Sequence, residues 1–209
     1  MRGVVLTRSL LLLASALSLA SCDHGGGAQA SAPQDCAAFT PAADSPYTLP
    51  WQIGQAYVAQ PHLVFDPSVQ RYAIDAEMSI GTDVLAMRAG NVVRMQVSYF
   101  DGDLTPGHEN FVAVEHDDGS TARYVHLTHD GALVELGEHV QRGQRIALSG
   151  HTGNSAAPHL HFDVTRGCCA VPPDGNERPQ GETLPLTFSN ASPVADCGLQ
   201  QGINYVALP

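Results

Sequence analysis

The chain has 209 residues and a formal net charge of -11 at pH 7, with 10 basic residues, all of them arginine, against 21 acidic ones. This balance and the absence of a basic patch argue against nucleic acid or an anionic membrane surface as a partner. The length fits a single domain preceded by a leader and a linker.

The N-terminus has the features of an export signal. Arg2 and Arg8 provide positive charge, and residues 10–19 form an apolar stretch too short to span a bilayer as a mature helix. The stretch ends in Leu19-Ala20-Ser21-Cys22, which resembles a bacterial lipobox. The resemblance implies removal of residues 1–21 as a signal peptide, lipidation of Cys22, and export to a membrane-anchored place in the periplasm or cell envelope. An ordinary secretory signal is the alternative.

Four further cysteines indicate disulfide bonds, since an even number of thiols in an exported protein usually pairs. They are Cys36, Cys168, Cys169 and Cys197. A bridge between the adjacent Cys168 and Cys169 would be strained, so we expect each of these two to pair with Cys36 or Cys197. A zinc site made of all four thiolates is the alternative, but the chain lacks the Cys-x-x-Cys spacing typical of such sites.

The distribution of glycine and apolar residues predicts an all-β domain. Residues 22–46 are rich in Gly, Ala, Ser and Pro and are expected to form a flexible tether. From 47 to 190, short β-type runs alternate with glycines suited to turns, without a helical periodicity. We expect an antiparallel sheet or sandwich over 47–190 and a C-terminal tail over 191–209 that a disulfide could join to it. The expected strands are 72–75, 83–88, 91–97, 111–116, 122–127, 145–149 and 159–164, and another could lie near 183–188.

Two histidines one residue apart provide the first indication of chemistry. His159 and His161 lie in a run that reads as a strand, so both project from one face while Leu160 and Phe162 project from the other. One imidazole could bind a metal while its neighbour transfers a proton. An isolated His-x-His pair is more often a pair of exposed strand residues, but other residues of suitable chemistry lie upstream.

An ordered series of motifs surrounds this pair between residues 72 and 164. The motifs are Tyr72-Ala73-Ile74-Asp75, Gly81-Thr82-Asp83, Gly90-Asn91-Val92-Val93, His116-Asp117-Asp118-Gly119, Tyr124-Val125-His126-Leu127, Val140-Gln141-Arg142-Gly143, Ser149-Gly150-His151-Thr152-Gly153-Asn154 and Pro158-His159-Leu160-His161-Phe162. Together they resemble the lysostaphin/LytM-type zinc endopeptidases, which cleave peptidoglycan cross-bridges.

The resemblance implies a role for each polar residue of the series. Asp75 and His161 would be ligands of Zn²⁺, with one coordination position left for water. The metal would polarise the scissile carbonyl and lower the pKa of water. His159 would act as general base, and His126 would donate a hydrogen bond to the developing oxyanion. The implied substrates are the peptides of peptidoglycan.

One position departs from the family pattern, which places a histidine ligand four residues before the aspartate. That residue is Arg71, whose guanidinium cannot bind a cation. Strand alternation would place Arg71 on the face of Asp75, where the two could pair. His62 could complete the ligand set if its segment folds back over the site and Arg71 turns outward; otherwise His62 is a surface-loop residue. Without a third ligand, the chain would be a non-catalytic domain that binds cell wall or activates an amidase as its protein partner.

Overall fold

Antiparallel β-strands form nearly all of the regular structure, which confirms the expected all-β class. The computed structural model describes residues 36–62, 70–167 and 182–209, and these residues all belong to one unit, Pro33–Pro209. The expected signal peptide and Cys22 lie outside the described residues. Within the described ranges, no helix is long and apolar enough to cross a bilayer.

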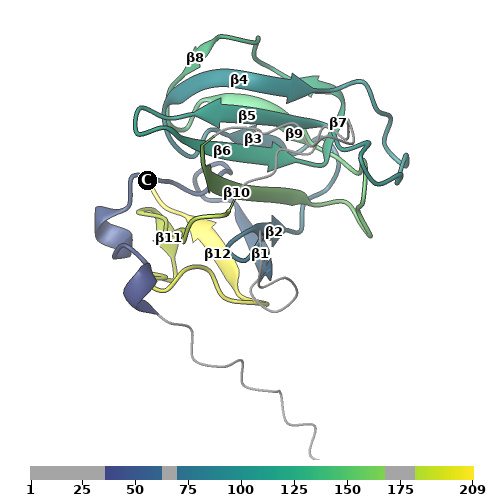
Figure 1. Cartoon of the computed structure of the whole chain (residues 1–209). Helices are drawn as coiled ribbons and strands as arrows, with labels where there is room; N and C mark the ends of the chain where they lie inside the picture. The colour runs from purple at the N-terminus through teal and green to yellow at the C-terminus, as the bar shows by residue number, and fades with distance from the viewer. Residues whose placement is uncertain (1–35, 63–69, 168–181) are drawn as a thin grey trace, which may run out of the picture. The chain divides into compact units, whose positions relative to one another are not determined.

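The larger sheet has nine strands in the order β11-β12-β1-β2-β10-β6-β5-β4-β8 (Figure 1). A three-stranded sheet, in the order β3-β9-β7, lies behind its upper half in this view. The strands of the larger sheet are β1 (Ala56–Pro61), β2 (Ile74–Ala76), β4 (Gly90–Gln96), β5 (Phe111–Glu115), β6 (Ser120–Val125), β8 (His139–Val140), β10 (Leu160–Arg166), β11 (Ala191–Ser192) and β12 (Asn204–Ala207). Those of the smaller sheet are β3 (Asp83–Leu85), β7 (Leu127–Ala132) and β9 (Arg145–Ser149).

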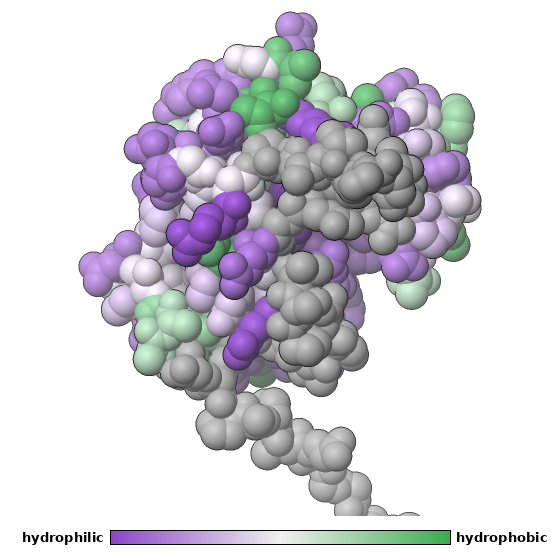
Figure 2. Space-filling view, in the orientation of Figure 1, coloured by the Kyte–Doolittle hydropathy of each residue, from purple (hydrophilic) through white to green (hydrophobic). Residues whose placement is uncertain are grey.

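The hydrophobic core is built from the inward-pointing residues of the strands. On β10, Leu160, Phe162 and Val164 are fully buried members of this core, and Phe162 packs edge-on against Trp51 with ring centroids 6.2 Å apart. The intervening β10 residues, His161 among them, are buried too. Both faces of β10 are therefore covered, one by apolar side chains and the other by polar ones. The face of the molecule in Figure 2 is largely hydrophilic, with smaller apolar areas.

The expected strands 83–88, 91–97, 111–116, 122–127, 145–149 and 159–164 are present, with ends shifted by no more than three residues. The expected strand 72–75 starts later, at Ile74, because the residues just before it form a turn closed by a bond from the Ala73 N–H to the Gln70 carbonyl (2.9 Å). The segment near 183–188 contributes a single bridge between Thr183 and Thr165 and no strand.

Both ends of the described chain differ from expectation. Part of the expected tether forms the 3-10 turns η1 (Cys36–Ala38) and η2 (Ala42–Asp44). The buried Ala42 donates its N–H to the Asp196 carboxylate at 2.8 Å. Residues 191–209, expected as a tail, contain β11 and β12, and β12 pairs with β1 in the larger sheet. The domain therefore extends beyond the expected 47–190 in both directions.

The disulfide of the structure joins these two ends. Cys36 is bonded to Cys197, so the expectation that each of them pairs with Cys168 or Cys169 is wrong. The N-terminal turns pack against the C-terminal segment, and this brings the two distant cysteines together. Cys168 and Cys169 lie outside the described residues.

Replacing both Cys36 and Cys197 by serine should lower the free energy of unfolding by roughly 2–5 kcal/mol, because the crosslink restricts the unfolded chain over a long loop. Urea unfolding followed by circular dichroism would measure the difference between the double variant and the oxidised wild-type protein. Coinciding unfolding midpoints would contradict the prediction.

Candidate metal centre

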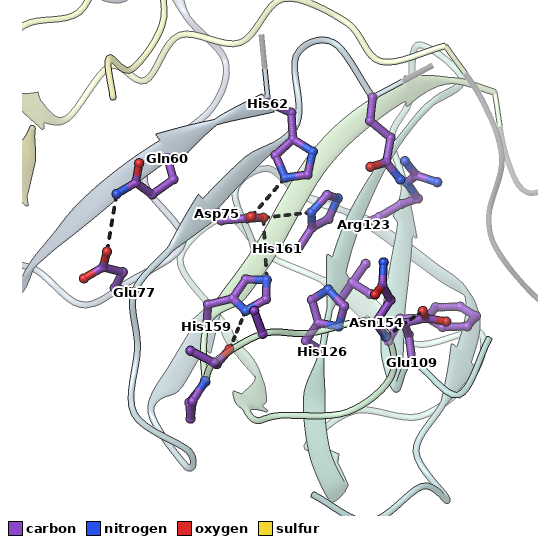
Figure 3. Close-up of a pocket in the computed structure, with 16 residues that line it drawn as sticks. Gln60, His62, Asp75, Glu77, Glu109, Arg123, His126, Asn154, His159 and His161 are labelled. Atoms are coloured by element: carbon purple, nitrogen blue, oxygen red, sulfur yellow. Dashed lines mark hydrogen bonds and ion pairs between the residues drawn. The ribbon is translucent and has the colours of Figure 1, made fainter. Parts of the chain in front are cut away.

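The pairing of three neighbouring strands brings distant polar residues together. In the ladder between β2 and β10, Asp75 lies directly opposite His161, and in the ladder between β1 and β2 it lies opposite Gln60. His62 follows the last residue of β1, and its backbone N–H donates to the Ala73 carbonyl at 2.9 Å. This bond keeps the chain beside β2 just past the end of β1, so that the His62 side chain reaches Asp75 (Figure 3).

The side chains of His62, Asp75 and His161 form a compact cluster. The Asp75 Oδ2 atom is 2.9 Å from the His62 Nε2 atom, and its Oδ1 atom is 2.9 Å from the His161 Nδ1 atom. One donor atom from each residue falls within 4.8 Å of the others, a spacing that could hold a metal ion. Two imidazole nitrogens and one carboxylate form a ligand set that zinc accepts.

Arg71 lies away from this cluster. Because β2 begins at Ile74, strand alternation does not extend back to Arg71, and the expectation that it shares the face of Asp75 is wrong. Arg71 is exposed, and its guanidinium carbon lies 5.4 Å from the centre of the Tyr72 ring. Among the described residues, the ion pairs of Asp75 are all with histidines.

The ring of His161 lies between two carboxylates. Its Nδ1 atom faces Asp75, and its Nε2 atom is 3.4 Å from the Oδ2 atom of Asp163. Burial favours the neutral ring, but hydrogen bonds to Asp163 and Asp75 outweigh it and raise the pKa of His161 to about 9. Burial would raise the pKa of the Asp75 carboxyl, yet hydrogen bonds with His161 and His62 hold it well below its usual range.

Two further histidines stand beside the cluster. The ring of His159 lies 4.5 Å from the ring of His126, centre to centre, and the His159 Nε2 atom is 3.7 Å from the Asp75 Oδ1 atom. Burial lowers the pKa of both rings, that of His126 to about 3 with smaller contributions from His159 and His161. Both rings are therefore neutral at pH 7.

Hydrogen bonds to backbone carbonyls fix the tautomer of these two rings. The Nδ1 atom of His126 is 2.6 Å from the Thr152 oxygen, and that of His159 is 2.7 Å from the Ala157 oxygen. A carbonyl only accepts, so each Nδ1 carries the proton and each Nε2 has a free lone pair. In this state both rings can accept a proton. His126 could donate to an oxyanion, the role that the family resemblance implies, only after gaining a second proton.

The loop after β9 sets the position of His126. Gly150 passes so close to β7 that a Cβ atom there would lie 2.3 Å from the Thr128 nitrogen. This close approach brings Thr152 beside the joint between β6 and β7, where His126 adopts a positive φ of 62°. The glycine of the Ser149-Gly150-His151-Thr152 motif is thus needed for the loop to reach the site.

The cluster lies in a cleft of about 630 Å³. Besides the four histidines and Asp75, further polar residues line it, among them Gln60 from β1, Glu77 directly after β2, and Glu109 and Asn154 from loops (Figure 3). A cleft of this size can admit a peptide segment rather than only a small ion or solvent.

The charged pair beside His161, Asp163 and Arg123, was not expected from the sequence. Asp163 follows His161 by two residues on β10 and so projects from the same face, and Arg123 lies directly opposite Asp163 on β6. Strand alternation alone could have identified Asp163, since it continues the polar face of the His-x-His run. Nothing in the sequence indicated that Arg123 would be its partner.

A β-rich domain with a His-Asp-His cluster in an open cleft is an arrangement suited to metal-dependent hydrolysis. Residues 69–173, about half of the chain, match the sequence model of Peptidase family M23, and the chain belongs to this family.

Several proteins are similar to this part of the chain. The peptidoglycan DD-endopeptidase ShyA of Vibrio cholerae is 39% identical over 94 residues, which are 44% of this chain and 20% of ShyA. Lysostaphin of Staphylococcus simulans is 38% identical over 91 residues, 44% of this chain and 17% of lysostaphin. The lipoprotein YgeR of Escherichia coli is 32% identical over 108 residues, 52% of this chain and 39% of YgeR.

Among solved structures, the catalytic domain of lysostaphin is 30% identical to this chain, with a TM-score of 0.41, over 63% of this chain and 88% of that domain. The chain spans only about a fifth of the length of the two DD-endopeptidases, ShyA and ShyB, that it matches.

In protein stripped of metal ions by a chelator, the His161 ring should titrate near pH 9, while the His126 ring stays neutral down to about pH 3. Since the unfolded ring titrates near 6.5, charged His161 stabilises the fold below that pH, and this contribution is lost as pH rises through 9. Two-dimensional ¹⁵N–¹H spectra of the imidazoles would follow both titrations. A His161 ring that titrates near 6.5 would contradict the arrangement between two carboxylates.

Proposed function

We propose that this chain is a zinc-dependent endopeptidase that hydrolyses peptide cross-links of peptidoglycan. The observation that carries the proposal is the convergence of His62, Asp75 and His161 beside two neutral histidines in an open cleft. Membership of Peptidase family M23 supports peptidase chemistry in general.

In this proposal, zinc is held by the His62 Nε2 atom, the His161 Nδ1 atom and a carboxylate oxygen of Asp75. Catalytic zinc sites typically have three protein ligands and leave a fourth position open. When bound, the ion acts as a Lewis acid that polarises the scissile carbonyl and lowers the pKa of water. The donor set fits zinc because one nitrogen of each imidazole already lies 2.9 Å from an oxygen of the Asp75 carboxylate, so the three ligands face one another.

His159 and His126 are proposed to transfer protons during the reaction. His159 has its Nδ1 proton bound to the Ala157 carbonyl, so its Nε2 lone pair can take the proton of the attacking water. His126 has the same tautomer and stands 4.5 Å away, ring to ring. It would become a donor to the developing oxyanion or to the leaving amine once a proton has reached it.

The proposed substrate is a peptide cross-link rather than a free amino acid or nucleotide. The cleft is open, and the described residues that line it include the carboxylates Glu77 and Glu109. The described arginine among them, Arg123, is bonded to Asp163. ShyA is named as a peptidoglycan DD-endopeptidase, and it shares 39% identity with the matched segment. We propose peptidoglycan peptides on these grounds.

The proposed location is the cell envelope, with the chain exported and anchored to a membrane by a lipid on Cys22. The support is the Leu19-Ala20-Ser21-Cys22 motif and the similarity to YgeR, which is named as a lipoprotein. Anchoring would hold the enzyme near a polymer that cannot diffuse to it.

The alternative function is a non-catalytic domain that binds cell wall or activates a partner amidase, and it is favoured by Arg71 at a ligand position. Because Arg71 lies over the Tyr72 ring and Asp75 contacts histidines, this support for the alternative is weakened. The two functions differ in whether zinc-loaded protein cleaves purified peptidoglycan.

The purified protein should bind one zinc ion, and His62→Ala and His161→Ala should each weaken binding at least 100-fold, since each removes a proposed ligand. Arg71→Ala is the matched control and should bind zinc like the wild type. Metal analysis after dialysis and competition with a chromophoric chelator would measure stoichiometry and affinity. A His62→Ala variant with wild-type affinity would show that His62 is not a ligand.

His159→Ala and His126→Ala should keep zinc but lose cleavage of purified sacculi by roughly 10²–10⁴-fold, the usual contribution of a proton-transferring side chain. His139→Ala, at an exposed position on β8, should retain activity and serves as the control. Release of muropeptides followed by chromatography gives the rate. If zinc-loaded wild-type protein releases none, the non-catalytic alternative holds.

A further inference from the structure

We propose that Arg123 and Asp163 form a positioning pair that fixes the ring of His161 for metal binding. The proposal rests on the proposed function, since it assigns these two residues a task in the same site. Neither residue was expected from the sequence to belong to it.

The pair is built into the register of the larger sheet. Arg123 on β6 lies directly opposite Asp163 on β10. The Arg123 Nε atom donates to the Asp163 Oδ1 atom at 2.6 Å, and the Nη2 atom donates to Oδ2. Such bidentate hydrogen bonding fixes the plane of the carboxylate more firmly than a single hydrogen bond from lysine would.

Asp163 in turn orients the ring of His161. The two residues alternate on the same face of β10, and the Oδ2 atom of Asp163 is 3.4 Å from the His161 Nε2 atom. With Nε2–H directed to this carboxylate, the Nδ1 atom of the neutral ring keeps its lone pair on the side of Asp75 and His62. Carboxylates that accept from the second nitrogen of a ligating histidine set its tautomer and ring plane in the same way.

Burial indicates that the pair is more than a surface contact. Asp163 is 0% exposed and Arg123 is 4% exposed. A buried ion pair of this kind contributes little net stability, because desolvation offsets the attraction, and apolar residues of similar size often replace it without loss. The orientation of His161 is the property that an apolar replacement could not reproduce.

The test uses zinc affinity of the full chain, measured by competition with a chromophoric chelator at a temperature well below unfolding. The double variant Arg123→Met/Asp163→Leu removes both charges together and leaves no buried charge unpaired. It should bind zinc 10- to 100-fold more weakly than the wild type, with little change in its unfolding midpoint. Zinc affinity within threefold of wild type would overturn the proposal and leave the pair a purely structural role.

A second variant keeps the test decisive if the first does not fold. Arg123→Met/Asp163→Asn has a neutral pair whose amide oxygen can still accept from the His161 Nε2–H. It should bind zinc more weakly than the wild type and, where both variants fold, more tightly than the leucine variant. Affinity equal to the wild type would again overturn the proposal.

The matched control is Arg145→Met/Asp83→Leu, which removes an exposed arginine–aspartate pair of the smaller sheet. Its zinc affinity should equal that of the wild type. Failure of the proposed function gives a different result, because the wild-type protein itself would then bind no zinc. If the wild type binds one ion and the leucine variant binds it equally well, only the role of Arg123 and Asp163 fails.

Discussion

The structure of the site depends on one register, the antiparallel pairing that sets Asp75 on β2 opposite His161 on β10. Residues 86 positions apart in the sequence meet in this way with a carboxylate oxygen 2.9 Å from a ring nitrogen. A slip of one residue would move every side chain of the strand to the other face. The apolar residues of β10, Leu160, Phe162 and Val164, resist such a slip because their burial in the core requires the opposite face.

Two carboxylates lie beside His161, and each has its own partners. Asp163 is paired with Arg123, and Asp75 is surrounded by histidines. One buried and one half-buried carboxylate so close together would be costly without these partners. A divalent cation at His62, Asp75 and His161 would take over the compensation of Asp75, while Asp163 keeps its arginine. In this account the site accepts a metal with little rearrangement because its ligands already face one another.

Much of the fold and of the site could be predicted from sequence, since both follow from local patterns. The period-2 alternation around His159 and His161 and the glycine-flanked runs are short-range signals, and they located the central strands. The sequence does not predict strands β1 and β12, because neither has a clear alternation of apolar and polar residues. They are held by pairing with each other, although they lie far apart in the sequence. The Cys36–Cys197 bond was missed for the same reason, since it depends on packing between the two ends.

The position of Arg71 shows where local patterns fail. Strand alternation predicts that Arg71 faces Asp75, but the turn over 70–73 ends the alternation before β2, and Arg71 lies over the Tyr72 ring. That turn frees the face of Asp75 for His62, which the sequence left as one of two alternatives. The role of Asp163 was within reach of the strand pattern, whereas its pairing with Arg123 required the register between β6 and β10.

The most direct test of the account is a crystal structure of the zinc-soaked protein, with anomalous differences recorded on both sides of the zinc absorption edge. The account predicts one strong peak bounded by the His62 Nε2 atom, the His161 Nδ1 atom and the Asp75 carboxylate, with Arg71 turned away. A peak that excludes His62, or an Asp75 carboxylate paired with Arg71 and without zinc, would contradict it.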